Sequence, residues 1–120
     1  MRQELLVSIL NDLTSASGDI EAAAVISTEG LMIASVLPAG SDVGRVGAMT
    51  AAMLSLGERT ASELGRGDLE QVIVKGLKGY VLMLRAGEDA LLLLLVRPQA
   101  KLGLIFLDAK RAAENLVKVV

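Results

Sequence analysis

Ala90-Leu91-Leu92-Leu93-Leu94-Leu95-Val96 is the longest uninterrupted apolar run in the 120-residue sequence. Periodicity alone does not separate a strand from a helix here, but the short length and the flanking Asp89 and Pro98 favour a strand. The run does not alternate between apolar and polar side chains, so as a strand it must be buried on both faces. We therefore expect residues 90–96 to lie in the middle of a sheet, with helices on each side.

Two further strands are predicted before this run, over residues 69–75 and 80–86. Only four residues, 76–79, separate these two segments, and three residues, 87–89, separate the second from the apolar run, which is short enough for hairpin turns. Residues 68–75 alternate in a half-exposed pattern that suits a sheet edge. Such an edge must be charged or paired, so either Asp68 and Lys75 protect it, or it pairs with its own copy across a two-fold axis.

The N-terminal part of the sequence predicts a helix, a hairpin and a second, long helix. Leucine and isoleucine recur at helical spacing over residues 2–16, and residues 21–28 and 31–37 form two strands around the turn Glu29-Gly30. Residues 43–65 have helical spacing, and a last helix carries an apolar stripe from Ile105 to Val120. The predicted order is α-ββ-α-βββ-α, a single α/β (α+β) domain over residues 1–120.

Composition excludes several classes of function. Twelve basic and fourteen acidic residues give a net charge of -2 without any basic tract, so we expect no binding to nucleic acid or membrane. The sequence has no cysteine and no histidine, and Glu88 and Asp89 fall in a predicted turn, so we expect no catalytic residue, no metal site and no cofactor. A cytoplasmic protein that is not an enzyme is the expectation.

The long helix, residues 43–65, has two unlike faces. One stripe is apolar and is expected to pack on the sheet: Val46, Met49, Met53, Leu56, Thr60 and Leu64. The opposite face is built from small residues: Gly44, Gly47, Ala48, Ala51, Ala52, Ser55 and Ser62. Glycine costs a helix roughly 1 kcal/mol relative to alanine, so this face is interpreted as a surface that a second helix approaches closely. The alternative is that a terminal helix of the same chain covers it.

The hairpin Ala22–Ser35, the alanine-rich helix over residues 43–65 and the tail Leu102-Gly103-Leu104 resemble the Roadblock/dynein light chain family. The family's hairpin turn is commonly Asp-Gly, and here it is Glu29-Gly30. The resemblance covers essentially the whole chain and implies a five-stranded antiparallel sheet sandwiched between helices, in a Roadblock/profilin-like fold. It also implies a dimer formed through the third strand and the second helix.

Prokaryotic members of the family often work beside a Ras-like small GTPase, so the resemblance implies a homodimeric regulator whose paired second helices form a platform for that partner. A structural adaptor of the dynein light chain kind is the alternative. The predicted contacts to the GTPase are Arg45, Arg59 and Arg66, as part of a platform rather than as an arginine finger. The predicted dimer interface is Gly44, Gly47, Ala48, Ala51, Ala52, Ser55, Arg59, Gln71, Val72, Ile73, Val74 and Lys75.

Overall fold

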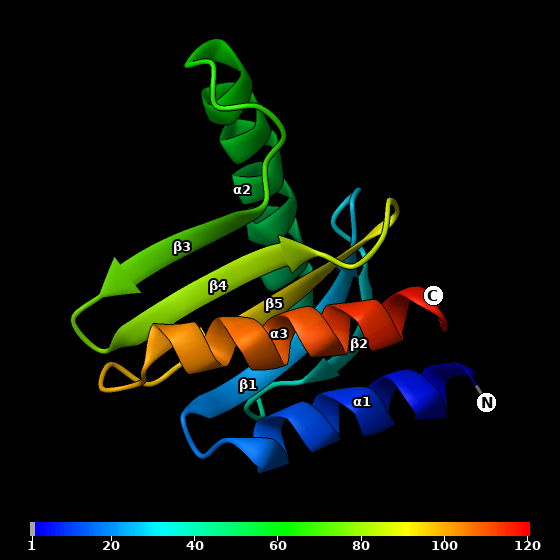
Figure 1. The fold of residues 1–120 in the computed structure, drawn as a ribbon. Coiled ribbons are helices and arrows are strands. Elements are labelled where there is room, and N and C mark those ends of the chain that lie inside the picture. The colour runs from blue at the N-terminus through cyan, green and yellow to red at the C-terminus, as the bar shows by residue number, and fades with distance from the viewer. Residues whose placement is uncertain (1) are drawn as a thin grey trace.

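The computed structural model describes residues 2–120 and contains three helices around one sheet (Figure 1). The order α-ββ-α-βββ-α agrees with the prediction. The elements are α1 (Arg2–Ala16), β1 (Ile20–Ser27), β2 (Met32–Val36), α2 (Val43–Glu63), β3 (Gln71–Gly76), β4 (Gly79–Arg85), β5 (Ala90–Val96) and α3 (Leu102–Val117).

The sheet has five strands in the order β2-β1-β5-β4-β3, and every neighbouring pair is antiparallel. The apolar run is the central strand β5, as predicted, with Leu92 and Leu94 buried on one face and Leu91 and Leu93 buried on the other. The strand expected at the edge, β3, is at the edge, but it begins at Gln71 rather than at residue 68 or 69. The strand begins later in the sequence because Leu69 packs beneath α2 instead of pairing with β4.

The three helices are divided unevenly between the two faces of the sheet. Helices α1 and α3 lie side by side on one face, and α2 lies alone on the other (Figure 1). The core beneath α1 and α3 is the larger of the two and includes Leu6, Leu10, Ile105 and Leu116, all nearly or fully buried.

Helix α2 begins and ends at residues that suit helix termini. The Asp42 side chain accepts a hydrogen bond from the backbone N–H of Arg45 at 3.1 Å, which satisfies one of the free donors of the first turn. Beyond the helix, Gly65 has a φ of 70°, a backbone conformation that glycine adopts without strain. The chain reverses there and returns to the sheet at β3.

The C-terminal half of α2 extends past the sheet. Gly57 lies close to the sheet side of the molecule, where a Cβ on it would be 3.0 Å from side-chain atoms of Leu69 and Val72. Figure 1 shows the rest of the helix rising beyond β3, and residues 62–66 are all exposed. Helix α2 therefore overhangs the open edge of the sheet.

Candidate functional site: the exposed surface of α2 and β3

The face of α2 that packs on the sheet agrees only in part with the one that the sequence predicts. Gly47, Thr50 and Leu54 are its buried residues. Within the apolar stripe expected to face the sheet, Met49 is 53% exposed and Leu56 67% exposed. Leu64 belongs to the same stripe and is 68% exposed. Thr60 is exposed as well, so the prediction is wrong for four of the six residues of the stripe, whereas Val46 and Met53 pack against the core on the sheet as predicted.

The small residues of α2 explain the rotation of the helix, because they admit the turn of the chain's own hairpin. Gly30, with a φ of 97°, lies against α2, and a Cβ on it would be 3.2 Å from the carbonyl oxygen of Gly47 and 3.4 Å from the Cβ of Ala51. A methyl group on Gly47 would overlap the carbonyl oxygen of Gly30. The small face therefore serves, at Gly47 and Ala51, a contact within the chain, made by the β1–β2 turn and not by a terminal helix.

Because of this contact, some of the predicted interface residues are buried within the chain and others remain exposed. On α2, Gly47 is buried and Ala51 half-buried, whereas the other predicted residues are exposed, namely Gly44, Ala48, Ala52, Ser55 and Arg59. On the strand, Gln71 and Val72 are half-buried, and Ile73, Val74 and Lys75 are exposed. Most of the predicted interface residues are therefore accessible in the single chain, on α2 and along the edge strand.

An apolar groove runs between α2 and the sheet. It has a volume of about 220 Å³, and its lining is almost entirely apolar. Leu37, Val46, Met49, Met53, Val74, Val81, Leu93 and Leu95 supply the apolar lining. Since Met53 and Val46 line the groove from the helix, the apolar stripe of α2 faces the groove with its N-terminal part and solvent with its C-terminal part.

We call the exposed apolar residues of the helix and of the edge strand the α2–β3 surface: Met49 and Leu56 of α2, Leu64 at its C-terminal end, and Ile73 and Val74 of β3. Val74 lines the groove, and Ile73 points to the opposite face of the sheet. Ile73 is 42% exposed and Val74 is 47% exposed, at the open edge of the sheet. Apolar side chains gathered beside an apolar groove and an unpaired strand are typical of a protein interface.

The three arginines predicted to contact a partner are all exposed, on α2 or just after it. Arg45 and Arg59 are separated by about 21 Å along the helix, at a rise of 1.5 Å per residue. Arg59 forms an exposed ion pair with Glu63, with the two groups 3.6 Å apart. The Arg66 side chain donates to the backbone oxygen of Leu64 at 3.1 Å and so follows the end of the helix. None of the three is needed for the core of the chain.

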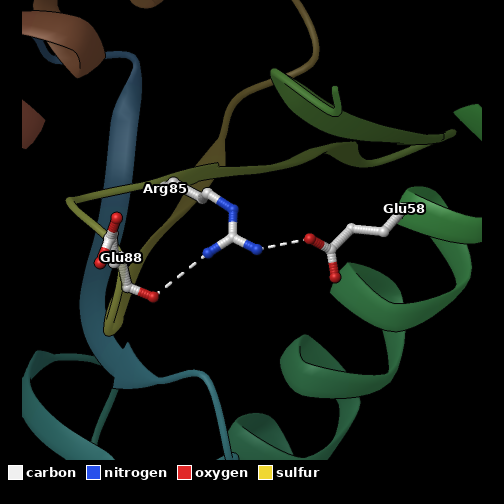
Figure 2. A network of polar contacts seen from close by, with 3 residues as sticks. All are labelled: Glu58, Arg85 and Glu88. Carbon is white, nitrogen blue, oxygen red and sulfur yellow. Dashed lines mark hydrogen bonds and ion pairs between the residues drawn. The ribbon is translucent and has the colours of Figure 1, made fainter. Parts of the chain in front are cut away.

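A polar contact that the sequence did not predict attaches α2 to the end of β4. Figure 2 shows Arg85 between Glu58 of α2 and the β4–β5 turn, where it pairs with the Glu58 carboxylate and donates to the backbone oxygen of Glu88 at 3.3 Å. Because 27 positions separate the two partners of the ion pair, no local pattern could have revealed it. The contact links the middle of α2 to the end of β4 and to the β4–β5 turn.

Two kinds of feature are missing from residues 2–120. Among these residues no group of three or more acidic, histidine or cysteine side chains is placed to hold a metal ion. No helix in the same range is long and apolar enough to cross a membrane.

A protein-family model described as the Roadblock/LC7 domain matches residues 6–96, from the first helix to the end of the central strand. The chain belongs to the Roadblock/LC7 family. The resemblance read from the hairpin and the alanine-rich helix is confirmed by this match, and so is the five-stranded antiparallel fold that it implied.

Other members of the family and its structural relatives agree with this assignment. An uncharacterized protein of the archaeon Methanocaldococcus jannaschii, MJ1340, is 43% identical over 108 residues, which cover 90% of this chain and 93% of that protein. The structure of the gliding protein MglB from Thermus thermophilus superposes with a TM-score of 0.86, at 24% identity, over 98% of this chain and 90% of that one. A structure described as MglB with tetrameric arrangement gives 0.88, at 25% identity, over 98% and 89%.

Proposed function

We propose that this Roadblock/LC7 protein is a non-enzymatic homodimer that regulates or scaffolds a Ras-like small GTPase in the cytoplasm. The α2–β3 surface is the observation that supports the proposal best. It combines an unpaired strand, exposed apolar side chains and an apolar groove in one place, and a second copy of the chain satisfies all three together.

The geometry of α2 supports a two-fold dimer. Helix α2 crosses the sheet near the start of β3, where Gly57 meets Val72, whereas the groove lies toward the other end of β3, at Val74. A two-fold axis through the middle of β3, perpendicular to the sheet, exchanges these two ends. The overhanging half of the partner's α2 then lies over the groove, and the two helices run antiparallel across one continuous sheet.

The outer faces of the paired helices form the platform for the GTPase. Arg45 and Arg59 are exposed on α2 and are the residues that we expect to contact the GTPase there. A flat, non-catalytic platform acts by binding one conformation of its partner better than another, which shifts the population of that partner between its states. The similarity to MglB and the family assignment favour this function over that of an adaptor for larger subunits.

The experiment that tests the dimer compares two charge substitutions by light scattering. Leu56→Glu puts a carboxylate on the α2–β3 surface, and Leu104→Glu does the same on α3, where the leucine is 61% exposed and thus closely matched to Leu56 at 67%. We expect a dimeric wild type, a dimeric Leu104→Glu protein and a monomeric Leu56→Glu protein, because a buried unpaired charge is costly. A monomeric wild type would refute the homodimer.

The same three proteins test the GTPase partner. A Ras-like small GTPase from the same genome, loaded with GTPγS or with GDP, is titrated with each protein by calorimetry. We expect the wild type and Leu104→Glu to bind one nucleotide state more tightly than the other and Leu56→Glu to lose binding. If the intact dimer binds neither state of any such GTPase, the adaptor function takes the place of the regulator.

A further inference from the structure

The side chains and the free backbone groups of the edge strand β3 predict how two copies pair, provided that the proposed homodimer exists. Residues opposite each other in an antiparallel pair point to the same face of the sheet, and neighbours along a strand point to opposite faces. A two-fold axis perpendicular to the sheet must therefore pass midway between one residue and its own copy, and we describe that residue as lying on the axis. In the middle of β3 this residue is Val72, Ile73 or Val74.

The two faces of β3 are fixed by its neighbours within the chain. Val72 packs under Gly57 and Val74 lines the groove, so these residues face α2. Gln71, Ile73 and Lys75 face the other side, where the Lys75 amino group lies 5.7 Å from the centre of the Tyr80 ring. Each of the three possible registers pairs these side chains differently.

With Ile73 on the axis, the pairs match in polarity. Ile73 faces its own copy, Val72 faces the partner's Val74, and Gln71 faces the partner's Lys75. Apolar side chains meet apolar ones on both faces, and the amide of Gln71 meets an ammonium group that it can accept a hydrogen bond from. Cross-strand pairs of this kind are the unit of sheet stabilisation.

The other two registers pair unlike side chains. With Val72 on the axis, Gln71 faces the partner's Ile73, and Glu70 faces the partner's Val74. With Val74 on the axis, Ile73 faces the partner's Lys75. Ile73 therefore lies opposite a polar or charged side chain in both registers, and with Val72 on the axis Val74 does so as well.

The backbone favours the same register. The turn Leu77-Lys78 closes on the pair Gly76–Gly79, and from there the ladder alternates along β3 and β4. By this alternation Gln71, Ile73 and Lys75 direct their N–H and C=O groups away from β4. With Ile73 on the axis, Ile73 pairs with itself and Gln71 with Lys75, so all of these groups find partners. In either other register one of the three residues faces no residue of the partner's strand.

We propose that two copies pair through β3 with Ile73 on the two-fold axis. This register also brings the turn Leu77-Lys78 of one protomer beside residues 68–70 of the other. Leu77 is 100% exposed in the single chain, and it would approach the partner's Leu69. Lys78 would approach the acidic residues Asp68 and Glu70, so the two ends of the paired strands are complementary in charge.

Single cysteines test the register cleanly because the chain contains no cysteine of its own. The three variants are Ile73→Cys, with Val72→Cys and Val74→Cys as matched controls on neighbouring residues. Each is oxidised with copper phenanthroline, and the disulfide-linked dimer is measured on a non-reducing gel. In a hydrogen-bonded antiparallel pair, the Cα atoms of residues that face each other lie about 5.5 Å apart, which a disulfide can bridge. Diagonal neighbours lie too far apart for a disulfide to form easily.

We expect Ile73→Cys to cross-link to itself and the two valine variants to cross-link weakly. Preferential cross-linking of Val72→Cys or Val74→Cys overturns this register but leaves the dimer through β3 intact. A dimer by light scattering in which none of the three variants cross-links overturns pairing through β3. A monomer refutes the homodimer itself, so the two proposals fail in distinguishable ways.

A pair of charge substitutions at Gln71 gives a second, independent readout. If Gln71 faces the partner's Lys75, Gln71→Glu adds two symmetric ion pairs and Gln71→Lys adds two repulsions. We expect the dimer dissociation constant to fall by roughly three- to tenfold for the first and to rise by roughly as much for the second. Weaker association of both variants indicates that Gln71 faces an apolar residue, which overturns the register.

Discussion

The two faces of the sheet differ in how far the chain itself covers them. On one face, α1 and α3 lie together over β1, β2, β4 and β5 and enclose a core that includes Leu10 and Leu92. On the other face, α2 stands alone, makes few contacts with the sheet and leaves a groove beside Met53. The chain closes the first face by itself and leaves the second partly open, where we propose that a second copy packs.

The largest expected effect comes from the closed face. Leu10→Ala removes a fully buried side chain of α1, whereas Leu64→Ala removes one that is 68% exposed on α2. We expect Leu10→Ala to lower the free energy of unfolding by about 2–5 kcal/mol and Leu64→Ala by less than about 0.5 kcal/mol. Urea denaturation in a Leu56→Glu background separates folding from association. Equal losses would mean that α2 is as much a part of the core as α1.

A smaller effect is expected where α2 meets the hairpin. Gly47→Ala forces a methyl group against the Gly30 carbonyl oxygen, so the turn or the helix must move, at a cost of about 1–3 kcal/mol. Gly44→Ala is the matched control in the same helix, with only the Asp42 side chain within 4 Å of the added carbon. There the substitution should stabilise the helix by up to about 1 kcal/mol. The contact is supported if thermal denaturation shows that Gly47→Ala lowers the stability and Gly44→Ala raises it. A Gly47→Ala protein that is as stable as the wild type contradicts the contact.

The smallest expected effect comes from the ion pair between α2 and β4. Glu58 and Arg85 are both partly exposed, so Glu58→Gln should cost at most about 1 kcal/mol, and high salt should remove the difference. Glu63→Gln is the control, because its pair with Arg59 lies within one helix and is more exposed. The comparison is made by denaturation at low and high salt. A loss for Glu63→Gln as large as that for Glu58→Gln would show that the Arg85 contact does not hold the helix.

The sequence predicted the closed face well and the open face poorly, and the reason is physical. The central strand, residues 90–96, and the edge strand were predicted because burial on both faces or on one face leaves a direct pattern in the side chains. The rotation of α2 was predicted wrongly because the rule that apolar stripes face the core assumes a helix with a single partner. Met49 and Leu56 are apolar although the sheet does not cover them.

The candidate site was predicted in part for the same reason. The strand residues Ile73 and Val74 are exposed at the edge where the pattern placed them. Gly47 and Ala51 were assigned to a partner, but the β1–β2 turn occupies that space. A signal was present in the sequence, since Gly30 in the turn and Gly47 in the helix are both residues without a side chain. Nothing in the sequence says that two such positions meet.

The contact between Gly30 and Gly47 has a consequence for how this protein can evolve. Each position can accept a side chain only if the other backbone withdraws, so a single substitution at either one is disfavoured while the other stays unchanged. Related chains should therefore keep glycine at both positions or change both, with a shifted turn. The distance between the β1–β2 turn and α2 would then differ among related proteins according to the residues at these two positions, and so would the angle between α2 and the sheet.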